Sequence, residues 1–228
     1  MKRFYKEVRA APDFSIELDD RPIKTPAKAT LVAPTRALAE AIAEEWREQG
    51  EIIRPSDMIV TRLANTAIDR VQTLPEDFVG ELLTFGKCDL LCYRAPEPDE
   101  LLLRQEVDWN PLLEWARLTL GADLKTTKGI DHIEQDEGAI AALENVLRLQ
   151  NSWSLAGLQT ATTITGSLIL ALALVQGRLD AAETFALSHL DDAFQTENWG
   201  RDQEAEKRTQ RHAVELEVAA RFMALARA

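Results

Sequence analysis

The stretch from Gln195 to Arg208 gathers several side chains that could do chemistry. Its carboxylates are Glu197, Asp202, Glu204 and Glu206. Carboxylate oxygens are the preferred ligands of Mg²⁺ and Ca²⁺, and neighbouring carboxyl groups can act as general acid and base. Metal ligation or acid–base catalysis is therefore one use that these residue types allow. A metal-dependent enzyme stays open as an alternative function.

A tryptophan in the same stretch suggests a second use. The apolar helical period stops after Phe194 and resumes only at Val214, yet Trp199 lies in between. In one interpretation Asp202 caps a solvated helix and Trp199 packs on a neighbour. In the other, an exposed aromatic framed by polar and acidic groups binds a protein partner, since Trp is enriched at interface hot spots. The residues predicted to bind are Gln195, Glu197, Trp199, Asp202 and Glu204.

Other motifs for catalysis or cofactor binding do not match. Gly80 to Cys88 resembles a phosphate loop, but five residues separate Gly80 from Gly86 instead of four, and Cys88 stands where Ser or Thr would bind Mg²⁺. Cys88 and Cys92 have three residues between them, a spacing that fits neither a redox pair nor a zinc site. We therefore expect reduced, buried thiols that hold no metal, and no cofactor.

The charge distribution argues against several classes of partner. The net charge is −12; residues 1–80 carry 12 basic and 14 acidic side chains, and residues 81–228 carry 14 and 24. Nucleic acids and anionic membranes need clustered Lys and Arg, so neither is an expected partner. No apolar run follows Met1–Phe4, so the chain lacks the pattern of a secretory signal.

The elements that position these residues are organised around one uncharged segment. Ser154 to Gln176 holds no Asp, Glu, Lys, Arg or His, and Leu168 to Val175 is apolar on every face of a helix. Such a helix must be buried in a protein or a membrane. Hydroxyl and amide groups crowd its first half and no aromatic belt flanks it, so a core helix is predicted and membrane insertion is not. Gly157 and Gly166 would let neighbouring helices approach closely.

The first part of the chain has a different pattern. Phe14, Ile16 and Leu18 alternate with polar residues, as in a half-buried strand. Thr35 precedes a helical pattern over 36–49, in which Trp46 is expected to anchor the core. The prediction is an α+β protein, with a small antiparallel β-rich domain at 1–78 and a helical domain packed round the buried helix at 79–228.

Further helices are expected in the second domain, among them the following three. One covers Leu101 to Leu120, with an interruption near Pro111; one runs from an Asp180 cap through Phe194; and one covers Asp202 to Ala228. Proline inside a helix removes a hydrogen bond, which is the reason to expect the interruption.

Several stretches, in order along nearly the whole chain, match the pattern of a known family. They are Arg3–Val8, Leu18–Pro26, Leu38–Trp46, Thr61–Asp69, Trp109–Leu113, Gly157–Gln159, Gly166–Leu168 and Gln195–Ala205. Through these stretches the chain resembles the assembly chaperones for the alpha subunit of the F-type ATP synthase, which include mitochondrial ATP synthase assembly factor 2. Asp20, where the family usually has a turn Gly, and Ile59, where Pro is common, depart from the pattern.

The resemblance implies a β-rich N-terminal domain, a helical C-terminal domain and no catalysis. It implies an ATP-independent chaperone whose partner is the unassembled alpha subunit, held until beta covers the same surface. It also implies a cytoplasmic location for a bacterial form without a transit peptide, and the mitochondrial matrix for eukaryotic relatives. A generic helical adaptor with another protein client is the remaining alternative.

Overall fold

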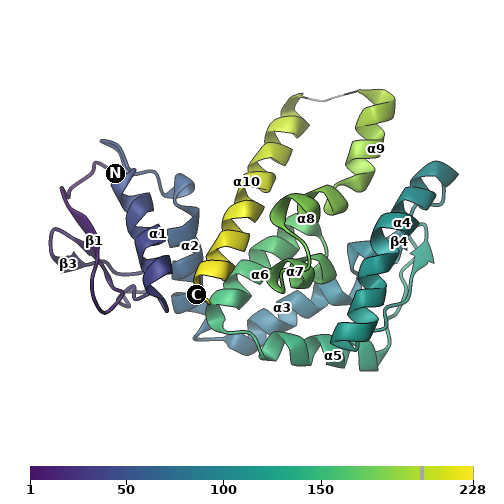
Figure 1. Ribbon diagram of the computed structural model, residues 1–228, viewed down its shortest axis with the longest axis horizontal. Helices are drawn as coiled ribbons and strands as arrows, with labels where there is room; N and C mark the ends of the chain where they lie inside the picture. Colours follow the sequence, from purple (N-terminus) through teal and green to yellow (C-terminus); the bar gives the residue numbers. More distant parts are fainter. Residues whose placement is uncertain (201–202, 228) are drawn as a thin grey trace. The chain divides into compact units, whose positions relative to one another are not determined.

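The computed structural model describes residues 1–200 and 203–227 and shows an α+β protein (Figure 1). Its internal contacts group the residues into two units. The first comprises Met1–Pro75, Asn151–Gly157 and Val218–Ala228, and the second comprises Glu76–Gln150 and Leu158–Glu217. The predicted boundary between two folding domains, at residues 78 and 79, is not tested by this grouping and stays a prediction.

The first unit contains a three-stranded antiparallel sheet, in which β1 (Val8–Ala10), β2 (Ile16–Leu18) and β3 (Arg21–Pro22) are neighbours in chain order. The two-residue turn between β2 and β3 has positive φ at both positions, 48° at Asp19 and 64° at Asp20. Hairpin turns of this kind favour Gly, Asn and Asp. Asp20 therefore occupies a left-handed position, which accounts for the Gly that the related family prefers there.

Helices cover this sheet. The Thr35 hydroxyl accepts a hydrogen bond from the Leu38 N–H and caps α1, as the sequence predicts, and α1 packs on β1 and β2. Ile59 is the first residue of α2, a position that also suits Pro. The helical segments here are α1 (Arg36–Arg47), the 3₁₀ turn η1 (Pro55–Asp57), α2 (Ile59–Thr66) and the π-helical η2 (Ala67–Val71).

Parts of α6 (Ser152–Thr165) and α10 (Gln203–Leu225) complete the first unit. The rings of Trp153 and Phe222 lie 5.9 Å apart. A β-carbon at Gly157 would lie 2.3 Å from Met223 Cγ, so the helices approach more closely than any larger residue allows. The close approach predicted for Gly157 is confirmed.

Gly157→Ala is expected to lower the free energy of unfolding by about 1–2 kcal/mol, because the added methyl group overpacks this contact and the gain in helix propensity offsets only part of the cost. Gly80→Ala is the matched control: Gly80 is an exposed helical glycine with nothing within 4 Å of an added β-carbon. That variant should gain about 0.5–1 kcal/mol. Urea unfolding of both variants checks the pair, and equal stabilities would contradict the close packing.

The second unit is largely helical and packs around α7, whose eight residues are all buried. α7 contacts α4 and α8. A β-carbon at Gly86 would lie 3.0 Å from Leu143 and 3.3 Å from Leu168, so α3 approaches α5 and α7 closely. The remaining elements are α3 (Pro75–Lys87), η3 (Leu90–Cys92), β4 (Tyr93–Arg94), α4 (Asp99–Trp115), the π-helical η4 (Ala116–Leu120), β5 (Thr127–Lys128, parallel to β4), α5 (Glu137–Arg148), α7 (Leu168–Val175), α8 (Ala181–Ser188) and α9 (Leu190–Trp199).

The uncharged segment forms two helices instead of one. Gly166, with φ of 67°, separates α6 from α7, and the Ser167 hydroxyl caps α7 by accepting from the Leu170 N–H. Asp89, which is fully buried, accepts hydrogen bonds from the Ser167 hydroxyl at 2.7 Å and the Ile169 N–H at 3.0 Å. At this break, the Ile169 and Leu170 N–H groups therefore donate to the buried side chains of Asp89 and Ser167 instead of to helical carbonyls.

Other local expectations were wrong. Pro111 lies inside α4, which runs on to Trp115, and His189 separates α8 from α9 where one helix was predicted. Cys92 is buried and its thiol pKa is raised by burial, but Cys88 is exposed. By contrast, Gly80 to Lys87 lies in helix α3, in agreement with the sequence mismatch that argues against a phosphate loop there.

Candidate functional site

The end of α9 carries three of the five residues that the sequence selected, Gln195, Glu197 and Trp199. Phe194 anchors this helix, with only 4% of its surface exposed. Gly200 ends it, with φ of 89° and ψ of 179°, a combination open almost only to Gly. The helix therefore stops directly after Trp199, which is its last residue.

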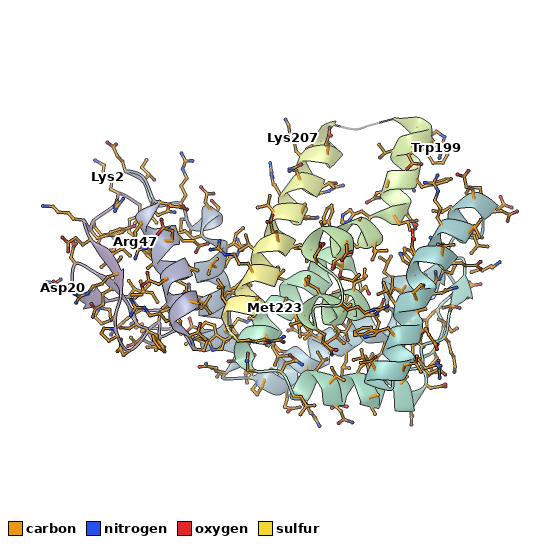
Figure 2. The ribbon with its side chains drawn as sticks, in the orientation of Figure 1. Lys2, Asp20, Arg47, Trp199, Lys207 and Met223 are labelled. Carbon is orange, nitrogen blue, oxygen red and sulfur yellow. The ribbon has the colours of Figure 1, made fainter. Side chains whose placement is uncertain are left out.

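Trp199 is the most notable side chain of this surface. It is 76% exposed, and Figure 2 shows it at the tip of α9. Leaving a large aromatic in water forgoes about 1.5–3 kcal/mol of burial free energy. The interpretation in which Trp199 packs on a neighbouring element is therefore wrong for this structure.

The Arg104 side chain links α4 to α9. Its Nη1 donates to Glu197 Oε2 at 2.8 Å and its Nη2 to Glu100 Oε1 at 2.9 Å, while the guanidinium lies 5.1 Å from the ring centre of Phe194. The hydrogen bond to Glu197 raises the pKa of Arg104 further above its usual value. Glu197 thus has a cationic partner within its own chain, and a client would have to compete with it or bind the pair as a unit.

Partly buried hydrogen bonds join α4 to α8 and α9. Gln105 Nε2 donates to Asp191 Oδ1 at 2.7 Å, and the Trp109 indole N–H donates to the Leu187 carbonyl at 3.0 Å. Arg94 donates to the Gln105 carbonyl at 2.6 Å, and burial lowers the pKa of its guanidinium. The surface that bears Trp199 therefore rests on a rigid support, as a binding site requires.

An apolar stripe lies on the same face of α4 as Arg104. Leu103 and Val107 are 60% and 63% exposed. Together with Glu100 and Arg104 they are spaced i, i+3, i+4 and i+7, which places all four on one helix face. We call Leu103, Arg104, Val107, Glu197 and Trp199 the α4–α9 surface.

The predicted binding residues have different surroundings. Gln195 and Trp199 are exposed, Glu197 is exposed but paired with Arg104, and Glu204 is exposed on α10. Asp202 lies outside the described residues. Leu103, Arg104 and Val107 were missed in the sequence analysis. The pattern that could have identified them is that α4 carries apolar residues on two faces, whereas a helix that packs on a core needs only one apolar face.

Two kinds of site are not found. Within 1–200 and 203–227, no group of three or more His, Cys, Asp or Glu side chains is placed to hold a metal ion. In that same part of the chain no helix has the length and apolar character needed to cross a bilayer.

Solved structures of other proteins share this fold. Atp12 from Paracoccus denitrificans, in a solved structure, shares it with a TM-score of 0.91, at 38% identity, over 99% of this chain and 98% of that one. A solved protein from Agrobacterium tumefaciens is similar at a TM-score of 0.90 and 42% identity, over 97% of this chain and 84% of that one. This is an α+β chain with a small antiparallel sheet and a larger helical part.

Sequence comparison then gives the family. The ATP12 chaperone protein family model matches residues 2–117. The mitochondrial protein atp12 of Schizosaccharomyces pombe is 29% identical over 215 residues, covering 87% of this chain and 74% of that protein. The chain belongs to the ATP12 chaperone family, as the sequence resemblance predicts.

Proposed function

We propose that this protein is an ATP-independent chaperone of F-type ATP synthase assembly, and that its client is the unassembled alpha subunit. The α4–α9 surface is the proposed binding face. The observation that carries this proposal is the exposed Trp199, held at a helix end beside an ion pair in a member of a chaperone family. The alternative is a helical adaptor with a different client, and the binding measurements with the alpha subunit described below distinguish the two.

The physical role of such a protein follows from its client. A subunit surface that ends in an obligate interface is unusually apolar and aggregates when it is left bare. Trp199, Leu103 and Val107 offer apolar area for that surface, and Arg104 with Glu197 offers a paired charge at its edge. Binding and release then need no nucleotide, because beta competes for the same client surface.

Trp199→Ala is expected to weaken binding of the alpha subunit by about 2 kcal/mol or more, the scale of an interface hot spot. Its stability should change by less than about 1 kcal/mol, because the side chain is mostly in water. The measurement pairs urea unfolding with co-expression, in which the soluble fraction of alpha and its capture by the tagged variant are recorded. Ile130→Ala, at a residue that is 97% exposed in the same unit, is the control.

Glu197→Lys should also weaken client binding by about 2 kcal/mol or more while leaving the protein folded. Glu76→Lys is its control: Glu76 pairs with Arg148 at 2.8 Å, with exposures of 67% and 50% against 55% and 40% for Glu197 and Arg104. Both reversals disrupt an exposed ion pair, which is worth at most about 1 kcal/mol. If Glu197→Lys unfolds the protein, Glu197 has a structural role. If Glu197→Lys and Glu76→Lys both keep alpha soluble as well as the wild type does, the binding face lies elsewhere.

A further inference from the structure

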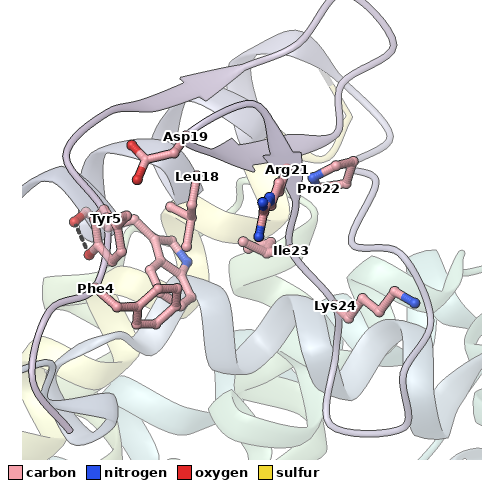
Figure 3. Close-up of a pocket in the computed structure, with 9 residues that line it drawn as sticks. Phe4, Tyr5, Leu18, Asp19, Arg21, Pro22, Ile23 and Lys24 are labelled. Carbon is pink, nitrogen blue, oxygen red and sulfur yellow. Dashed lines mark hydrogen bonds between the residues drawn. The ribbon is translucent and has the colours of Figure 1, made fainter.

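A pocket of about 510 Å³ opens on the first unit, and its lining includes no residue of the α4–α9 surface. Its volume falls in the range of about 300–1,000 Å³ that is usual for ligand sites. The stretches that form it come from the N-terminal segment, the β2–β3 hairpin and the end of α1 (Figure 3). Its lining residues are Phe4, Tyr5, Leu18, Asp19, Arg21, Pro22, Ile23, Lys24 and Trp46.

Apolar and aromatic side chains form part of this pocket and are held in place. Tyr5, Leu18 and Ile23 are nearly buried, with exposures of 5%, 6% and 9%. The Tyr5 hydroxyl donates to the Trp46 carbonyl at 2.7 Å, and the Tyr5 and Trp46 rings lie 5.7 Å apart. Trp46, predicted to be a core anchor, is thus a half-buried wall of a surface pocket. Because these side chains are already ordered, a ligand would meet a preformed surface.

One aromatic is left exposed at the edge. Phe4 is 64% exposed, although its ring meets Tyr5 edge to face with centroids 5.4 Å apart. Arg3 holds this segment against the end of α1: its Nη1 donates to the Gln49 carbonyl at 2.6 Å and its guanidinium lies 4.6 Å from the Tyr5 ring centre. Phe4 is therefore presented by an anchored backbone, with apolar area still in water.

The charges around the pocket are complementary to an anion. The carboxylate of Asp19 accepts the backbone N–H groups of Glu7 at 2.9 Å and Lys6 at 3.0 Å, which lowers its pKa and satisfies its charge. The side chains of Arg21 and Lys24 make no hydrogen bond or ion pair with any residue the structure describes, although the Arg21 charge contributes to the lowered pKa of Asp19. In Figure 3 the Arg21 side chain extends beside Ile23, whereas the ammonium of Lys24 points outward.

We infer that this pocket binds a segment of a protein partner in which a large apolar side chain is followed or preceded by a carboxylate. The apolar side chain would lie between Phe4 and Ile23, and the carboxylate would pair with Arg21, whose planar guanidinium suits bidentate binding. Aromatic residues and Arg are the residue types enriched in protein-binding hot spots, which favours a peptide as the occupant. This site is independent of the α4–α9 surface.

The test uses a capped peptide of sequence Gly-Asp-Phe-Asp-Gly and the full-length protein labelled with ¹⁵N. Titration should give saturable shifts of the Trp46 indole N–H, with a Kd below about 1 mM. Peptides with Lys in place of both Asp, or Ala in place of Phe, should bind at least about tenfold more weakly. Absence of saturation, or equal binding of the Lys peptide, would overturn the inference.

Variants of the protein complete the test. Arg21→Glu and Phe4→Ala should each weaken binding of the acidic peptide by about tenfold, with little change in melting temperature because both side chains are exposed. Arg54→Glu is the matched control, since Arg54 is exposed in the same unit and does not line the pocket. It should bind within about twofold of the wild type. Wild-type binding by both pocket variants would refute the site.

Discussion

Leu172→Asp is expected to unfold the helical unit. Leu172 lies in the middle of α7, a helix whose eight residues are all buried, and its own exposure is 0%. The substitution loses about 2–5 kcal/mol of packing and also places an unpaired carboxyl group where its ionisation costs several kcal/mol more. Since whole domains are stable by only about 5–15 kcal/mol, this change removes most or all of the stability.

Two variants make this expectation sharp. Leu172→Ala should stay folded with a loss of about 2–5 kcal/mol, which separates the cavity from the charge. Leu103→Asp makes the same chemical change at a residue that is 60% exposed on α4, and should cost less than about 1 kcal/mol. Circular dichroism, urea unfolding and size-exclusion chromatography measure all three. A folded, monomeric Leu172→Asp protein would show that α7 is not central.

The sequence predicts the elements whose causes are local. Thr35 and the apolar stripe of α1 indicate the start and the buried face of that helix, and both are present. The burial of Leu168–Val175 follows from the lack of any polar face. Each of these inferences needs only residues within a few turns of one another.

Features that depend on distant residues were not predictable in the same way. Gly166 ends α6 because Asp89, which is far away in the sequence, supplies hydrogen bonds at the start of α7. Glu197 is paired with Arg104, 93 residues earlier, so its charge is not free as composition suggests. Trp46 has the spacing of a core residue, and only the hairpin folded beside it makes it a pocket wall. Periodicity identifies which face is apolar but not what covers that face.

Asp89 is the second residue with a large expected effect, because it caps two elements at once from a buried position. Besides Ser167 and Ile169, the Leu91 N–H donates to its carboxylate at 3.0 Å, so the group serves the starts of both η3 and α7. Asp89→Ala removes three hydrogen bonds and leaves buried donors unpaired, each at a cost of about 1–3 kcal/mol. We expect a total loss of at least about 3 kcal/mol, measured by urea unfolding at pH 5.

The same carboxyl group should make stability depend on pH. Burial raises the pKa of Asp89 from 3.8 to about 6. Between those values the folded protein keeps a proton that the unfolded chain has released, so the free energy of unfolding falls as the pH rises. A shift of about two units corresponds to a loss of about 3 kcal/mol between pH 4 and 6, complete above the folded-state pKa.

Asp89→Asn isolates this contribution, because it keeps the size of the side chain but cannot ionise. We expect the variant to be less stable than the wild type at low pH, since its amide N–H₂ would face a backbone N–H donor. The difference between the two proteins should shrink by up to about 3 kcal/mol from pH 4 to pH 6.5, because only the wild type loses stability from this group. Asp108→Asn, at an exposed residue of the same unit, should differ from the wild type by less than about 0.5 kcal/mol throughout. A constant difference for Asp89→Asn would mean that the hydrogen bonds to Asp89 outweigh its burial and keep its pKa near 3.8.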